Sequence, residues 1–214
     1  MKKILKRLLG KKEYIDSIYE KTPMIKDLNS YCGGDLEFKN VVLVGDTVDK
    51  YNTEINSWIK TENLQLQTIN KVTDDLKTAE IYAINKELTG KIKAFVNIVG
   101  IESLLSDGVV EVNNKIVRNI YQWIQTETDY LIDNEIEANI CVVVTGMNKD
   151  CDVAKGIIKH MIAGLADSLG THNLILNGVF SYKKNMVINE LNTISFLISK
   201  YGQMMSGEVF EIHE

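Results

Sequence analysis

From residue 39 onward, the chain alternates between short apolar runs and longer amphipathic segments. The short runs are rich in β-branched residues, which is typical of buried strands, and the longer segments repeat apolar residues at helical spacing. This alternation predicts an α/β fold, in which right-handed crossovers place helices on both faces of a doubly wound, mostly parallel sheet. The predicted strands are 40–45, 64–69, 93–100, 139–146, 173–180 and 208–213, and the predicted helices are 49–60, 74–90, 109–132, 152–170 and 187–199.

The composition is that of an ordinary globular protein, with 45% apolar and 25% charged residues. The net charge of −5 argues against a nucleic-acid-binding surface over the whole molecule. No apolar run approaches the ~20 residues that span a bilayer, so we expect no membrane helix. Cys32, Cys141 and Cys151 lack the spacing of a disulfide framework or a zinc site. We therefore expect reduced thiols, a cytoplasmic location and no metal.

Residues 1–38 differ from the rest and are predicted to form a basic amphipathic extension to a single domain at 39–214. Six positive charges fall within residues 1–12, interleaved with apolar side chains at helical spacing. Two interpretations remain open. The segment docks on a protein partner or an acidic membrane surface, or it is a short solvated helix that leans on the domain.

The predicted helix at 152–170 is apolar along two stripes. A helix with two apolar sides is expected to be buried on both, by the sheet on one side and by a neighbouring helix or a second subunit on the other. We therefore expect a homo-oligomer that associates through the long helices. One stripe is Val153, Ile157, Met161 and Leu165, and the other is Ala154, Ile158, Ile162, Ala166 and Leu169.

Three segments carry a resemblance to a known family. The segment CDVAKGIIKHMIAGLADSLGTHNLILNGV places Lys155 22 positions before Asn177, with a helical apolar pattern between them. This arrangement resembles the short-chain dehydrogenase/reductase family, in which a Tyr-x-x-x-Lys pair opens a long helix and a strand that holds an Asn follows. KAFVNIVGI is similar to the family's Asn-Asn-Ala-Gly strand, and EVNNKIVRNIY to its next helix. The resemblance extends from about residue 38 to the C-terminus.

The resemblance implies a Rossmann-like fold and oxidoreductase activity with NAD or NADP. The positions that match the family's catalytic site are Lys155, Asn113, Thr145 and Cys151, and those that match its cofactor site are Gly45, Asn97, Gly100 and Lys155.

The catalytic positions depart from the family pattern. The family's catalytic Tyr falls on Cys151, whose thiol is too short to reach the place of a phenol oxygen, and general acid catalysis needs hydrogen-bond distance. The family's Ser has only Thr145 or Gly146 as a counterpart, at the end of a predicted strand. Lys155 itself has two interpretations, a retained site residue or a solvated helix side chain.

The cofactor loop departs further. The family motif Thr-Gly-x-x-x-Gly-x-Gly is matched by VGDTVDKY, in which Gly45 remains but Asp49 and Tyr51 replace the two later glycines. Those glycines let the backbone approach the pyrophosphate. A carboxylate at Asp49 would instead repel it, with Asp46 adding to the repulsion and Lys50 offsetting part of it.

Two further cofactor contacts are replaced. The family's adenine-contacting Asp falls on Lys71, and the Pro-Gly pair near the nicotinamide falls on Ser181 and Tyr182. The changes together affect adenine, pyrophosphate, nicotinamide and proton donor. They favour a protein that has lost its oxidoreductase activity, binds no cofactor, and acts as a scaffold or partner-binding subunit.

Two other hypotheses remain. One is an active reductase of carbonyl substrates with NAD or NADP and a rebuilt site of Lys155, Asn113, Thr145 and Cys151. The other is a thiol-dependent enzyme, in which Lys155 lowers the pKa of Cys151.

Overall fold

A parallel sheet forms the centre of the computed structural model, which describes residues 40–45, 52–62, 64–71, 75–101, 109–183, 188–199 and 202–213. In these residues the sheet has six strands in the order β2-β1-β3-β4-β5-β6, and every pairing is parallel. The strands are β1 (Asn40–Gly45), β2 (Gln65–Asn70), β3 (Ala94–Gly100), β4 (Ala138–Thr145), β5 (Leu174–Ser181) and β6 (Val209–Ile212). The predictions for residues 1–38, Asp46, Asp49, Lys50 and Tyr51 lie outside the described residues.

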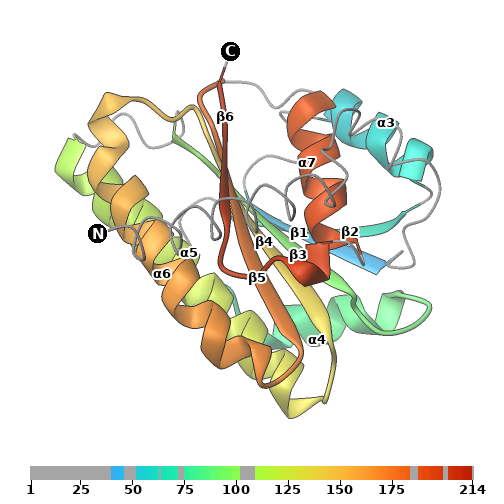
Figure 1. The fold of residues 1–214 in the computed structure, drawn as a ribbon. Coiled ribbons are helices and arrows are strands. Elements are labelled where there is room, and N and C mark those ends of the chain that lie inside the picture. Colours follow the sequence, from blue (N-terminus) through green and yellow to red (C-terminus); the bar gives the residue numbers. More distant parts are fainter. Residues whose placement is uncertain are drawn as a thin grey trace, which may run out of the picture.

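Helices cover both faces of this sheet (Figure 1). One face carries α4 (Thr78–Glu87), α5 (Val109–Asp133) and α6 (Asp152–Gly170), and the other carries α3 (Asn52–Glu62) and α7 (Ile188–Ile198). Two short 3-10 turns, Lys149–Cys151 and Gly202–Met204, precede α6 and β6. The predicted Rossmann-like α/β fold is confirmed, and each predicted strand and helix corresponds to an observed one.

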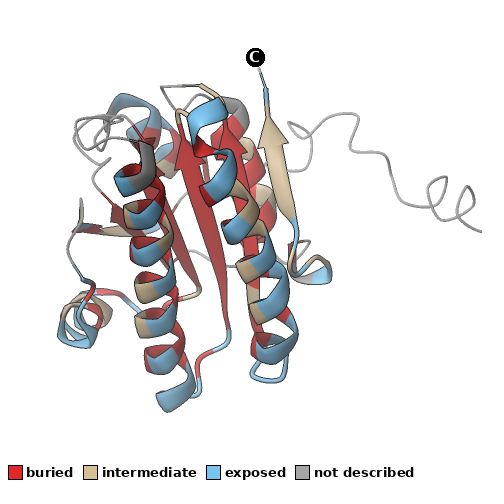
Figure 2. Ribbon diagram, turned by 90° about the vertical axis from the view of Figure 1, so that its left-hand side faces the viewer, coloured by how far each residue is buried: buried red, intermediate tan, exposed pale blue. Residues whose placement is uncertain are grey.

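The sheet separates two apolar cores. Alternate residues of each central strand point to opposite faces, so Val42 and Val44 enter one core while Val41 and Leu43 enter the other. Figure 2 shows the result, with red buried strands behind two long helices whose outer faces are pale blue. The central strands are predominantly apolar because helices exclude water from both of their faces.

The crossover from β5 through α7 to β6 does not have the predicted right-handed geometry. The steps β3 to β4, β4 to β5 and β5 to β6 run the same way along the sheet. Helices α5 and α6 make the first two steps on one face, but α7 makes the third on the other, so this last crossover has the opposite hand to the two before it. The prediction of uniformly right-handed crossovers is therefore wrong at α7. Because α7 packs on β4 and β5, it covers apolar surface that would otherwise face water.

Helix α6 buries only one of its two apolar stripes within the single chain. All five residues of the stripe that begins at Ala154 are buried against the sheet. On the other stripe, Val153 is 65% exposed and Ile157 is 48% exposed, while Met161 and Leu165 are partly buried. Burial by a second subunit stays a prediction. Among the described residues, no helix is long and apolar enough to cross a membrane.

Candidate functional site

The strand order reverses beside β1, and Gly45 ends that strand. In open α/β sheets ligands bind beyond the carboxyl ends of the strands at such a reversal. Gly45 has a φ of 150°, and a Cβ atom there would lie 2.1 Å from the carbonyl oxygen of Ile98 on β3. Glycine is therefore required at this position for β1 to pass close to β3, whether or not a phosphate binds nearby.

Asn97, on β3, points into the core under α5. Its side-chain amide donates a hydrogen bond of 2.8 Å to Oε2 of Glu127 on α5, and both residues are completely buried. Burial raises the pKa of Glu127 to about 8, although the Asn97 hydrogen bond opposes the increase. The observed partner of Asn97 is thus a core carboxyl group, and its predicted role in cofactor binding stays untested.

Asn113, on α5, holds the first turn of α6. Its side-chain oxygen accepts a 2.9 Å hydrogen bond from the backbone N–H of Ala154, and its amide donates to the carbonyl oxygen of Asp150 at 2.8 Å. Cys151 occupies the N-cap position of α6 but makes no capping hydrogen bond with its side chain. Asn113 therefore supplies the cap from a neighbouring helix, which links the starts of α5 and α6.

Cys151 is buried beside this cap. Its thiol donates a weak hydrogen bond to Oδ1 of Asn148 at 3.5 Å. Burial raises the pKa of the thiol, and the carboxylates of Asp150 and Asp152 raise it further, while a backbone hydrogen bond from Asn148 lowers it. A thiol in this environment stays protonated at neutral pH, and protonated thiols are poor nucleophiles.

Thr145 and Gly100 end two neighbouring strands and lie opposite each other in the sheet. Both residues are buried. The hydroxyl oxygen of Thr145 has no hydrogen-bond partner among the residues that the structure describes. The position of Thr145 at the carboxyl edge agrees with the sequence-based expectation, but its catalytic role stays a prediction.

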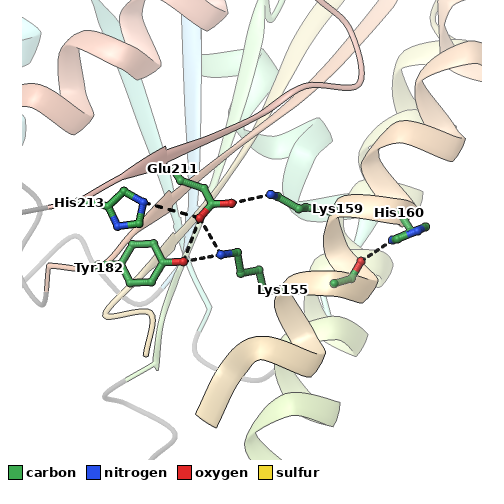
Figure 3. A network of polar contacts seen from close by, with 7 residues as sticks. Lys155, Lys159, His160, Tyr182, Glu211 and His213 are labelled. Carbon is green, nitrogen blue, oxygen red and sulfur yellow. Dashed lines mark hydrogen bonds and ion pairs between the residues drawn. The ribbon is translucent and has the colours of Figure 1, made fainter. Parts of the chain in front are cut away.

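Lys155 binds Glu211 on β6 and Tyr182, which directly follows β5 (Figure 3). Its Nζ donates to Oε2 of Glu211 at 2.6 Å and to the phenol oxygen of Tyr182 at 2.5 Å. Lys159, one turn along α6, donates to Oε1 of Glu211 at 2.5 Å, and the Tyr182 hydroxyl donates to Oε2 at 3.0 Å. The ring of His213 stacks on that of Tyr182 with centroids 4.4 Å apart. We call these five residues the Glu211 network.

The charges of the Glu211 network compensate one another only in part, because one carboxylate faces two ammonium groups. The two ammonium groups and the Tyr182 hydroxyl lower the pKa of Glu211 to about 2, and Lys155 makes the largest contribution. In return, the hydrogen bonds to Glu211 and Tyr182 raise the pKa of Lys155. Glu211 is therefore a fully charged carboxylate at neutral pH, and Lys155 and Lys159 share its single negative charge.

The backbone explains why these side chains meet. Lys155 and Lys159 are four residues apart and so share one face of α6. Parallel pairing places Phe180 opposite Glu211, and Tyr182 follows at the end of β5. Val209 packs in the core beneath α6, and because side chains alternate along a strand, Glu211 points to the same side.

A hollow of about 310 Å³ lies between α6 and the start of β6. It shares only Lys159 with the Glu211 network and does not bring the predicted site residues together. Its lining is Lys159, His160, Ala163, Gly207, Glu208 and Val209. In the described part of the chain, no group of three or more His, Cys, Asp or Glu residues could hold a metal ion.

Sequence reasoning missed Glu211, Lys159 and Glu127, and gave Tyr182 no role beyond its match to a family Pro-Gly pair. A signal for Glu127 was present, because Ile120, Ile124, Glu127 and Leu131 follow one another at helical spacing and place a carboxyl group within an apolar stripe. No comparable signal existed for Glu211. It lies 56 residues after Lys155, and only the pairing of β5 with β6 joins them.

Three of the described residues that the resemblance assigns to a dinucleotide make contacts within the chain itself. Asn97 is enclosed in the core and binds Glu127, Gly45 is required by the approach of β3, and Lys155 binds Glu211. The predicted role of these residues in cofactor binding stays a prediction.

No protein-family model and no curated protein matches the sequence. Solved structures of short-chain dehydrogenases, however, are similar to this one. A short-chain dehydrogenase from Mycobacterium smegmatis has a TM-score of 0.63 at 16% identity, covering 85% of this chain and 95% of its own. Acetoin dehydrogenase from Salmonella typhimurium has a TM-score of 0.61 at 12% identity, covering 81% and 95%.

A further similar structure is a short-chain dehydrogenase from Leptospira borgpetersenii with bound NAD+, which has a TM-score of 0.61 at 13% identity and covers 83% of this chain and 92% of its own. At such identities the similarity establishes the fold alone. The chain has the Rossmann-like fold of short-chain dehydrogenases, and its activity has to be argued from its own residues.

Proposed function

We propose that this chain is a non-catalytic protein on a short-chain dehydrogenase fold, which acts through contacts with a second copy or with another protein. The observation that carries the proposal is the engagement of Lys155 by Glu211. In the family that the sequence resembles, the equivalent lysine lowers the pKa of a catalytic phenol. Here a carboxylate at 2.6 Å, which Lys155 shares with Lys159, offsets part of the charge that would do so.

The position of the missing tyrosine supports the same proposal. Cys151 is buried, its pKa is raised, and the observed hydrogen bonds of the Lys155 ammonium group go to Glu211 and Tyr182 instead of to the thiol. Asn113 uses both ends of its side-chain amide to hold the first turn of α6. These contacts favour a structural use of positions that would otherwise serve catalysis.

The outer face of α5 and α6 is the proposed contact surface. This face carries three large apolar side chains that are exposed to solvent. They are Tyr121 on α5, which is 50% exposed, and Val153 and Ile157 on α6, which are 65% and 48% exposed. Burying them against another protein would remove apolar area from water, at roughly 25 cal/mol per Å². We propose that this face associates with a second copy of the chain, and residues 1–12 remain a second proposed contact, with a protein partner or an acidic membrane surface.

Equilibrium titration of the chain with NADH and NADPH, followed by cofactor fluorescence, tests the loss of cofactor binding. We expect no saturable binding at micromolar concentrations. Micromolar binding of either cofactor to the wild-type chain would overturn the proposal. The variant Glu211→Gln is titrated in parallel, and if it alone gained binding, Glu211 would be identified as the group that excludes the cofactor.

Sedimentation equilibrium tests the contact surface. We expect a mass above that of one chain, and we expect Ile157→Lys to reduce it because the new charge would be buried without a partner. Asp167→Lys, on the exposed side of the last turns of the same helix, is the matched control and should leave the mass unchanged. If the wild-type chain sediments as a monomer, self-association is ruled out, and contact with another protein is the proposal that remains.

A second candidate function is an active NAD(P)-dependent reductase with a rebuilt site. It is favoured by one observation, the 2.5 Å contact between Lys155 Nζ and the phenol oxygen of Tyr182. A lysine–phenol pair is thus present, but its tyrosine follows β5 instead of preceding Lys155 by four positions. This candidate predicts turnover of carbonyl substrates that Lys155→Ala and Tyr182→Phe abolish and that Cys151→Ser leaves intact. It is abandoned if Lys155→Ala leaves the measured turnover unchanged.

A further inference from the structure

We propose that Glu127 retains its proton at neutral pH and fastens α5 to the sheet through a paired contact with Asn97, which makes the anchoring of α5 sensitive to pH. This proposal concerns the interior under α5 and does not depend on the proposed function.

The contact joins the middle of the sheet to the longest helix. Asn97 lies on β3 between Phe95 and Val99, which pack in the core that α5 and α6 cover. Glu127 lies in the third quarter of α5, and the two side chains are connected by the 2.8 Å hydrogen bond from Asn97 Nδ2 to Glu127 Oε2. Both side chains are completely removed from water.

The two remaining side-chain oxygen atoms of the pair indicate that Glu127 carries a proton. Oε1 of Glu127 and Oδ1 of Asn97 have no hydrogen-bond donor among the described residues. Both atoms are acceptors if Glu127 is ionised, and two buried acceptors would then lack a partner, which is unfavourable. A proton on Oε1 would turn that atom into a donor, which could bind Oδ1 and satisfy both atoms at once.

No charge near Glu127 offers an alternative partner. In the described strands, the face of β1, β3, β4 and β5 that α5 and α6 cover bears no charged side chain, and the sheet-facing stripe of α6 is apolar. On α4, Glu80 pairs with Lys71. A further ionisable group on this side of α5, among the described residues, is Tyr130, which packs edge-to-face on Tyr82 of α4 and whose pKa is raised by burial, so it stays neutral.

The sign of the pH dependence follows from the pKa of Glu127 in the folded and in the unfolded chain. The pKa of Glu127 is about 8 in the folded chain, against an ordinary value of 4.5. Below pH 4.5 both the folded and the unfolded chain hold the proton, and the contribution to stability is complete. Between pH 4.5 and about 8 the unfolded chain has released the proton while the folded chain keeps it, so stability falls as the pH rises. Above pH 8 this contribution is lost.

Urea unfolding of the full chain at pH 5.5, 7 and 8.5 tests the proposal with the variant Glu127→Gln. Glutamine is neutral, has nearly the same shape, and can both accept from and donate to Asn97. We expect the midpoint of the wild-type chain to fall relative to that of Glu127→Gln as the pH rises, and we expect the two to differ most at pH 8.5. Glu111→Gln, an exposed residue of the same helix, is the matched control and should follow the wild-type profile.

Parallel profiles for wild type and Glu127→Gln would overturn the proposal. A second measurement covers the case in which the variant does not fold. Carboxyl-carbon NMR of the wild-type chain should show one glutamate that remains protonated at pH 7, whose signal titrates near pH 8. If every glutamate signal has reached its ionised shift by pH 6, Glu127 is charged and the proposal is wrong.

Discussion

Glu127 and Glu211 lie in regions that shift the pKa of a carboxyl group in opposite directions. Glu127 lies in the interior under α5 with one neutral donor, and burial raises its pKa to about 8. Glu211 lies near the carboxyl end of the outermost strand, where Lys155, Lys159 and Tyr182 lower its pKa to about 2. A glutamate side chain is thus a neutral acid at position 127 and a carboxylate that accepts several hydrogen bonds at position 211.

The difference shows what determines the ionisation state of a carboxyl group in this fold. Burial alone disfavours the ionised form, and a single amide cannot replace the water that is lost. Two ammonium groups at hydrogen-bond distance outweigh the smaller burial at the edge of the sheet. In both regions, polar groups that could serve a ligand are used for internal contacts, which is the basis of the proposed loss of catalysis.

The largest effect is expected when Asn97 is removed. Asn97→Ala would leave the Glu127 carboxyl group buried without the hydrogen-bond donor that it has among the described residues, and would open a small cavity in the core. We expect the free energy of unfolding to fall by about 3 kcal/mol, as measured by urea denaturation at pH 7. Asn114→Ala, at an exposed position of α5, is the control and should change stability by less than about 0.5 kcal/mol. A loss as small as that of the control would mean that the Asn97–Glu127 contact does not anchor α5.

A smaller effect is expected at Glu211. Glu211→Gln would leave Lys155 and Lys159 close together without their shared anion, and because the site is partly exposed we expect a loss of about 1 kcal/mol at pH 7. The pH dependence has the opposite sign to that of Glu127. The folded pKa is about 2 against an ordinary 4.5, so the contribution is present above pH 4.5 and is lost as the pH falls towards 2.

Acid titration of unfolding tests this sign. Between pH 4.5 and 2, the stability of the wild-type chain should decline more steeply than that of Glu211→Gln. Equal slopes in that range would show that Glu211 is not held as an anion by its neighbours.

The smallest effects are expected at the two lysines. Lys155 contacts both Glu211 and Tyr182 and its side chain is 21% exposed, whereas Lys159 contacts Glu211 and is 41% exposed. We expect Lys155→Met to cost about 0.5–1 kcal/mol and Lys159→Met a few tenths, because exposed ion pairs contribute little. Thermal unfolding at low ionic strength measures both, and the reverse order would contradict the assignment of Lys155 as the main partner of Glu211.

The sequence predicts the architecture well because the fold depends on patterns that lie within short segments. The β-branched run at 40–45 and the apolar periodicity at 152–170 match β1 and α6 residue for residue. The hand of the α7 crossover was not predictable in the same way. It depends on which face of β4 and β5 remains uncovered after α5 and α6 have packed, and no local pattern records that.

The candidate site was predictable only in part. The resemblance identified Lys155 and Asn113, and both lie at the start of α6 or contact it. Their partners were not predictable, because they depend on strand register and on packing between distant segments. Glu211 reaches Lys155 through the pairing of β6 with β5, and Asn113 reaches the first turn of α6 from the neighbouring helix α5.

The central claim is that Lys155 and Glu211 are occupied by each other and are not available to a dinucleotide. Side-chain NMR of the Lys155 ammonium and Glu211 carboxyl groups, recorded while NADH and then NADPH are added to millimolar concentration, tests it most directly. The account predicts that both signals stay unchanged throughout. A saturable shift of either signal, with a midpoint in the micromolar range, would contradict it.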